Sequence, residues 1–179
     1  MLQNLFHIPF TTFYLDSKSF LYKKTPRVDD HFGVYAITGL QGSGKTYNAV
    51  DFASKIDLDD VEIITNIHSL KLPHRNFDSI SEITSNFEQH KLFIIDEISS
   101  KYTKESKTDK PFYRWLQQTR KRKCIVILIT QEWKELPTWL RRPVSVQITV
   151  TETVFSHLLG IYRTMWGDGR NLKYDKDEG

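Results

Sequence analysis

The sequence is poor in cysteine, in long apolar runs and in any excess of one charge. Its 179 residues contain one cysteine, Cys124, so no internal disulfide can form, and the six histidines are scattered, which argues against a structural zinc site. No window approaches the roughly 18 consecutive apolar residues of a membrane-spanning helix, so we expect a soluble, intracellular protein without a transmembrane segment. The 25 basic and 22 acidic residues give a net charge of only +3, so any basic patch must be local.

The chain length predicts one compact domain with a short arm at each end. The content of hydrophobic residues, 39%, is enough for a single buried core. We expect residues 1–32 to form an aromatic-rich arm that packs on its own domain or on a neighbouring subunit. Residues 33–166 are the expected domain, and residues 167–179 are an expected flexible polar tail.

Apolar runs rich in Ile, Val and Leu alternate with helical patterns along the expected domain. Such runs are typical of parallel strands that are buried on both faces of a sheet. The expected strands are 34–38, 61–65, 91–95 and 124–130, and the expected helices are 46–56, 80–87 and 111–121. Residues 144–151 and 155–165 predict a C-terminal β-hairpin that turns at 151–154. The prediction is an α/β fold with a mainly parallel sheet and helices on both faces.

A glycine-rich loop follows the first expected strand. Its residues are Gly39, Leu40, Gln41, Gly42, Ser43, Gly44, Lys45 and Thr46. This order fits the phosphate-binding pattern in which backbone N–H groups surround phosphate oxygens. We expect Lys45 to reach the β- and γ-phosphates and Thr46 to place its hydroxyl on Mg²⁺, at the positive end of the following helix. ATP and Mg²⁺ are therefore the expected ligands, and the alternative is a plain glycine turn before a helix.

Two carboxylates follow the third expected strand. Asp96 stands where a carboxylate would hold Mg²⁺ beside the phosphate loop, directly or through water. Glu97 comes next and could orient and deprotonate an attacking water, which favours hydrolysis over transfer to a bound acceptor. The alternative is a solvated pair of strand-end carboxylates.

Gln131 follows the fourth expected strand. In parallel α/β sheets, ligands bind at the carboxyl ends of the strands. The Gln131 amide could therefore contact both the γ-phosphate and the water, and so sense the nucleotide state. The alternative is a polar strand cap.

Positive charge concentrates immediately before that strand. The basic run consists of Arg120, Lys121, Arg122 and Lys123. Three roles compete for it: an arginine finger in a neighbouring subunit's site, contact with a nucleic-acid backbone, and a solvated helix end. Arg141 and Arg142 form a second basic pair with the same alternatives. We expect Trp115, Trp133 and Trp139 to be core or interface anchors.

Four segments carry a resemblance to a known family. They are ITGLQGSGKT (37–46), IITNI (63–67), LFIIDE (92–97) and WLQQTRKRKCIVILITQ (115–131). Together they resemble P-loop NTPases of the FtsK/HerA type, which have a RecA-like fold, and within these the zonula occludens toxin-like assembly ATPases of filamentous phages. The discriminating features are Asn66 after the second strand and the spacing from Arg120 to Gln131.

The resemblance implies a function and further partners. By position, Gln131 would sense the γ-phosphate, and Arg120 would act in trans in the adjacent subunit. Relatives work as rings, commonly hexamers, so we expect a homo-oligomeric, ATP-hydrolysing motor that translocates or packages viral DNA. The host cytoplasm or the virion would be its location, and a capsid or virion membrane protein a further partner. A nucleotide-gated assembly scaffold and a small-molecule kinase stay open as alternatives.

Overall fold

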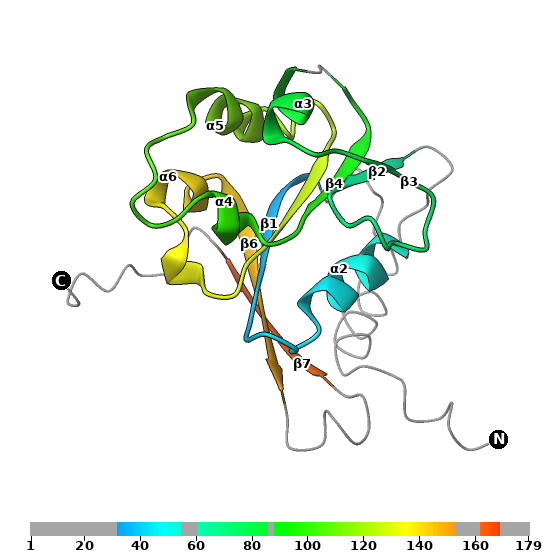
Figure 1. The fold of residues 1–179 in the computed structure, drawn as a ribbon, viewed down its shortest axis with the longest axis vertical. Helices are drawn as coiled ribbons and strands as arrows, with labels where there is room; N and C mark the ends of the chain where they lie inside the picture. Colours follow the sequence, from blue (N-terminus) through cyan, green and yellow to red (C-terminus); the bar gives the residue numbers. More distant parts are fainter. Residues whose placement is uncertain (1–31, 55–60, 86–87, 153–161, 169–179) are drawn as a thin grey trace.

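A computed structural model describes residues 32–54, 61–85, 88–152 and 162–168 (Figure 1). Its strands are β1 (Gly33–Thr38), β2 (Glu62–Thr65), β3 (His74–Asn76), β4 (Lys91–Ile95), β5 (Ile125–Ile129), β6 (Val144–Glu152) and β7 (Tyr162–Asp168). Its helices are α2 (Lys45–Ser54), α3 (Ile80–Ser85), α4 (Ile98–Lys101), α5 (Lys110–Gln117), the 3₁₀ helix η2 (Trp133–Glu135) and α6 (Thr138–Arg141). Within these ranges, no helix is long and apolar enough to cross a bilayer.

The strands described here form one sheet in the order β3-β2-β4-β5-β1-β6-β7. All neighbouring strands from β3 to β6 are parallel, and β7 runs antiparallel to β6. The predicted mainly parallel α/β fold with a C-terminal hairpin is therefore confirmed. In parallel sheets the carboxyl ends of the strands share one edge, so the segments that follow β1, β4 and β5 come together.

Each face of the sheet has its own hydrophobic core. Alternate residues of the central strands point to opposite faces, as the two-residue period of a strand requires. On one face they pack against α2, where Ala49 and Ala53 are buried and small enough for close contact with the sheet. On the other face they pack against α3, α5 and α6. Trp115 of α5 packs edge-on against Phe93 of β4, with ring centroids 4.8 Å apart.

A β-bulge at the start of β6 lets this strand contribute to both cores. Val34 pairs with Val144, but the next residue, Tyr35, pairs with Val146, so β6 has one extra residue. Because the extra residue shifts the alternation, Val144 packs in one core, while Ile148 packs in the other.

The helix predicted over 111–121 ends at Gln117, and this part of the prediction is wrong. The buried Thr119 hydroxyl donates to the backbone oxygen of Leu116, which competes with continued helical pairing. Lys123 then has a positive φ of 54°, and the chain reverses into β5. The basic run therefore lies on a tight turn and not on a helix end.

Other predicted boundaries also change. The hairpin was expected to turn at 151–154, but β6 continues to Glu152, and Thr151 pairs with Arg163. The second hairpin strand is Tyr162–Asp168, whereas the sequence predicts it over 155–165. The predicted arm 1–32, apart from Phe32, and most of the predicted tail 167–179 lie outside the described residues.

The short elements β3, α4, η2 and α6 were not predicted. Each has three or four residues, which is too few for a periodic pattern to be recognised in the sequence.

Candidate active site

An open pocket of about 880 Å³ lies at the carboxyl edge of the sheet. Its lining comes from the phosphate loop and α2, from the segment after β4, and from the segment after β5. It includes Gln41, Gly42, Lys45, Thr46, Asp96, Glu97 and Gln131. The fold thus brings together five side chains that the sequence assigned to nucleotide chemistry from positions 45 to 131.

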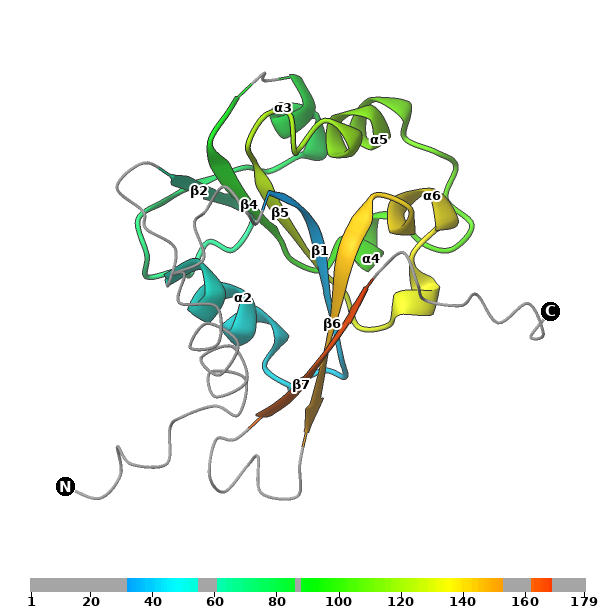
Figure 2. The same cartoon turned by 180° about the vertical axis from the view of Figure 1, so that it is seen from behind.

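The phosphate loop is shaped by its glycines. Gly42 and Gly44 have φ values of 82° and 84°, which side-chain-bearing residues rarely adopt. Gly39 is required for a different reason, because a Cβ there would lie 2.4 Å from the backbone oxygen of Val150 and 2.7 Å from Ser43 Oγ. The loop therefore packs against β6, and both views place it beside the β6–β7 hairpin (Figures 1 and 2).

Lys45 is turned back onto the loop that precedes it. Its ammonium donates a hydrogen bond to the backbone oxygen of Leu40 at 2.8 Å. Burial lowers the pKa of Lys45, and the charges of Asp96 and Glu97 oppose this shift. The ammonium is thus held at the concave side of the loop, where phosphate oxygens could replace the Leu40 carbonyl.

The residues expected to hold Mg²⁺ are in direct contact. Thr46 Oγ1 donates to Asp96 Oδ2 at 2.9 Å, so a hydroxyl and a carboxylate oxygen lie side by side. Hard oxygen ligands of this kind fit Mg²⁺, which usually completes its shell with water and substrate phosphates. In the described residues, no group of three or more His, Cys, Asp or Glu side chains is arranged so that it could hold a metal ion by itself. Substrate oxygens and water would have to supply the other ligands.

Asn66 organises the Asp96 main chain, a contact that the sequence analysis did not predict. Its amide nitrogen donates to the Asp96 backbone oxygen at 3.0 Å, and its amide oxygen accepts from the Asp96 N–H at 2.8 Å. This paired bond joins the end of β2 to the end of β4. The Thr-Asn sequence after the second strand was the available signal, but spacing alone does not give this contact.

Glu97 lies in the pocket lining with a left-handed backbone, φ 52° and ψ 42°. This conformation is uncommon for a residue other than glycine and often occurs at functional sites. The Glu97 N–H donates to Asp96 Oδ1 at 2.8 Å, and its carbonyl accepts from Ser100. These bonds fix the backbone of Glu97 while its carboxylate stays exposed at the pocket.

Gln131 connects the end of β5 to the phosphate loop through its main chain. The N–H of Gly39 donates to the backbone oxygen of Gln131 at 3.0 Å. The side chain of Gln131 is exposed in the pocket lining. A displacement of the Gln131 segment would therefore be transmitted to the first residue of the loop.

Arg120 lies at the opposite edge of the sheet and does not line the pocket. It precedes β5, and its guanidinium is 3.4 Å from Ser145 Oγ at the start of β6. Arg141 and Arg142 precede β6, so the fold brings both basic segments of the sequence to the same amino edge. Arg120 could therefore contribute to a nucleotide site only in another copy of the chain.

The fold and the phosphate loop define a P-loop NTPase of the α/β class. A family model described as "ATPase family associated with various cellular activities (AAA)" matches residues 35–152. The chain belongs to this family and is an ATP-hydrolysing P-loop enzyme. No curated protein matches the chain.

Solved structures share this fold at low sequence identity. The N-terminal domain of zonular occludens toxin from Neisseria meningitidis has a TM-score of 0.58 and 18% identity, over 76% of this chain and 94% of that one. The genome packaging NTPase B204 from Sulfolobus turreted icosahedral virus 2, bound to ATP-gammaS, has a TM-score of 0.55 and 16% identity, over 69% of this chain and 76% of that one. The VirB11 ATPase of the Brucella suis type IV secretion system has a TM-score of 0.52 and 14% identity, over 89% of this chain and 54% of that one. The predicted resemblance to such ATPases is confirmed for the fold.

Proposed function

We propose that this ATPase is the subunit of a homo-oligomeric ring that moves or packages viral DNA. One observation carries the proposal: the groups suited to hydrolysis and the basic segments lie at opposite edges of one parallel sheet. A head-to-tail ring would bring the basic edge of one subunit to the pocket of the next. Two structural relatives support this choice of function, because one is named a genome packaging NTPase and another a zonular occludens toxin domain.

The proposed site roles follow the pocket geometry. Lys45 and the loop amides bind the phosphates, and Thr46 and Asp96 hold Mg²⁺, which would offset phosphate charge. Glu97 accepts a proton from the attacking water, and Gln131 senses the γ-phosphate. Arg120 of the next subunit adds positive charge in the transition state. This division of roles explains why Arg120 lies far from its own phosphate loop.

DNA-stimulated turnover tests the proposal. ATPase rates are measured at low salt with single-stranded DNA, double-stranded DNA and no nucleic acid, and particle mass is measured with an ATP analogue. We expect DNA to raise turnover, the increase to fall as salt rises, and the mass to be a multiple of 21.1 kDa. The Lys45→Ala variant is the control for contaminating ATPases. An ATPase rate that is the same with and without every nucleic acid would refute DNA movement. A monomeric mass together with phosphate transfer to a small acceptor would indicate a kinase.

A further inference from the structure

The connection between α4 and α5 places a β-turn on the wall of the pocket. The Ser106 N–H donates to the Thr103 carbonyl at 2.9 Å, and Ser106 Oγ accepts from the Thr103 N–H at 2.9 Å. Lys104 and Glu105 are therefore the two central residues of a closed turn. Both line the pocket that contains Lys45 and Asp96.

The turn is held by the hydrophobic core beneath it. Tyr102 is buried, stacks on Phe112 at 5.8 Å and meets the Trp139 ring edge-on at 5.1 Å. The Trp139 indole N–H donates to the backbone oxygen of Ser106 at 3.2 Å.

The far end of the connection is tied to the same core. The Tyr102 hydroxyl donates to the Asp109 carboxylate at 2.5 Å, and Asp109 also caps α5. Burial, and next the hydrogen bond to Asp109, raise the pKa of Tyr102, so this donor stays protonated. The turn is thus attached at both ends and presents its two charged residues in a fixed place.

The charged side chains of the pocket lining favour a role for a second cation beside the phosphates. The lining contains three lysines, Lys45, Lys104 and Lys134, and four carboxylates, Asp96, Glu97, Glu105 and Glu135. A bound triphosphate adds further negative charge, while Lys45 is the only cationic side chain that the phosphate loop and α2 contribute to the lining. Lys134 already takes part in an interaction within the chain. Lys104 is exposed at its turn and, as an ammonium on a four-carbon chain, is suited to reach an oxyanion.

We propose that Lys104 contacts the terminal phosphate of ATP from this turn and acts as a catalytic residue in hydrolysis. In the reaction, the water oxygen bonds to the γ-phosphorus while the bond to the β–γ bridging oxygen breaks. ADP takes the bond's electron pair, and the water proton passes to Glu97. Lys104 stays protonated and offsets charge on the γ-phosphoryl oxygens as this bond breaks. The inference rests on the nucleotide site proposed above.

Steady-state kinetics of Lys104→Ala, Lys104→Arg and Lys107→Ala test this role. Lys107 is the matched control, because it is an exposed lysine of the same connection but outside the pocket lining. We expect Lys104→Ala to lower kcat about 100-fold, the effect of removing one oxyanion donor. Its affinity for a non-hydrolysable ATP analogue should change less than about threefold, as expected for an interaction specific to the transition state. Lys104→Arg should recover much of the rate, and Lys107→Ala should match the unchanged protein.

Two outcomes separate this inference from the proposed site. Lys104 has no catalytic role if Lys104→Ala and Lys107→Ala have the same kcat. If Lys45→Ala in the same experiment no longer binds the analogue, the proposed nucleotide site is still supported. If Lys45→Ala binds the analogue normally, the proposed site itself is wrong. Thermal melting of each variant verifies that it is folded, and a kcat loss in Lys104→Ala with unchanged melting supports the proposal.

Discussion

Asn66 illustrates what a single side chain contributes to this site. A side-chain amide can donate and accept at once, so it satisfies both main-chain polar groups of Asp96, its N–H and its C=O. Because the carboxylate of Asp96 accepts from both Thr46 and the Glu97 N–H, the main-chain position of Asp96 affects three proposed site residues. This dependence makes the segment after β4 sensitive to changes that leave the core intact.

The Glu97→Gln variant should bind ATP but hydrolyse it about 10²–10⁴-fold more slowly, the usual contribution of a general base. The amide keeps the size of the side chain but cannot take the water proton. Single-turnover hydrolysis and analogue binding separate the two effects. Glu132→Gln, at an exposed carboxylate outside the pocket lining, is the control and should behave as the unchanged protein. Normal turnover in Glu97→Gln would remove this residue from the mechanism.

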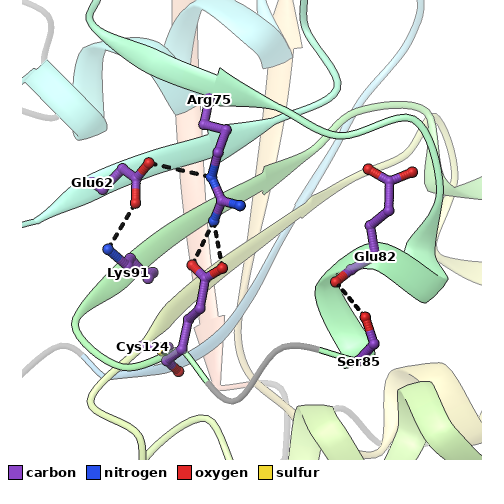
Figure 3. Close-up of polar contacts among 7 residues, drawn as sticks. Glu62, Arg75, Glu82, Ser85, Lys91 and Cys124 are labelled. Atoms are coloured by element: carbon purple, nitrogen blue, oxygen red, sulfur yellow. Dashed lines mark hydrogen bonds and ion pairs between the residues drawn. The ribbon is translucent and has the colours of Figure 1, made fainter.

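At the scale of secondary structure, charged side chains join the short edge strand β3 to the sheet. Arg75 of β3 donates to both Glu88 carboxylate oxygens, at 2.6 and 2.5 Å, and lies 3.3 Å from Glu62 of β2. Lys91 of β4 donates to Glu62 at 2.7 Å (Figure 3). β3 has only three residues, and Phe77 after it is buried, so these ion pairs supplement a small apolar contact.

The stability contributed by Glu62 should depend on pH. The hydrogen bond from Lys91 and the charge of Lys91, and after them the charge of Arg75, lower the pKa of Glu62, although partial burial opposes them. A lowered pKa in the folded state stabilises the protein above the unfolded value of about 4.3. The contribution is lost as pH falls through the folded pKa.

Glu62→Gln should therefore lower the free energy of unfolding at pH 7 by about 0.2–1 kcal/mol, the range for exposed pairs. The difference should begin to fall as the pH drops below the unfolded pKa of about 4.3, and it should shrink at high salt. Chemical denaturation at several pH values measures it, with Glu132→Gln as the control. A difference as large at pH 3 as at pH 7 would mean that Glu62 stabilises the fold by packing instead of charge.

At the scale of the whole molecule, the two edges of the sheet have different chemistry. The pocket lies at the carboxyl edge, and the segments 120–123 and 141–142 lie at the amino edge. Gly33 begins β1 at this basic edge, and its N–H donates to the Cys124 carbonyl at 3.0 Å. One strand, β1, therefore connects the basic turn to the phosphate loop that follows it.

Mixing subunits tests whether the two edges meet in an oligomer. Arg120→Ala alone should bind ATP and fail to turn over, because the transition-state charge lacks its partner. Added Glu97→Gln subunits should restore part of the activity, since they supply Arg120 to intact pockets. The same mixing experiment with Arg122→Ala, Arg141→Ala or Arg142→Ala shows whether one of these residues, instead of Arg120, is the arginine finger. No recovery in any mixture would exclude a shared site.

Local sequence gave the central strands and the glycine loop, because apolar runs and glycine conformations are properties of the chain itself. The end of α5 could not be predicted in this way. Thr119 is buried and its hydroxyl donates to the backbone oxygen of Leu116, and burial depends on the rest of the fold. Lys104 and Glu105 had no recognisable motif. Their place in the pocket depends on a turn that is fixed by aromatic rings far away in the sequence.

The sequence by itself therefore determined the kind of site: a phosphate loop, a strand ending in two carboxylates, and a glutamine after a buried strand. Only the tertiary structure decided which groups share the pocket and which do not. Parallel pairing brings the ends of β1, β4 and β5 to one edge, and it sends Arg120 and Arg142 to the other. The physical reason is that spacing along the chain fixes local conformation, whereas strand order and direction fix the distances between segments.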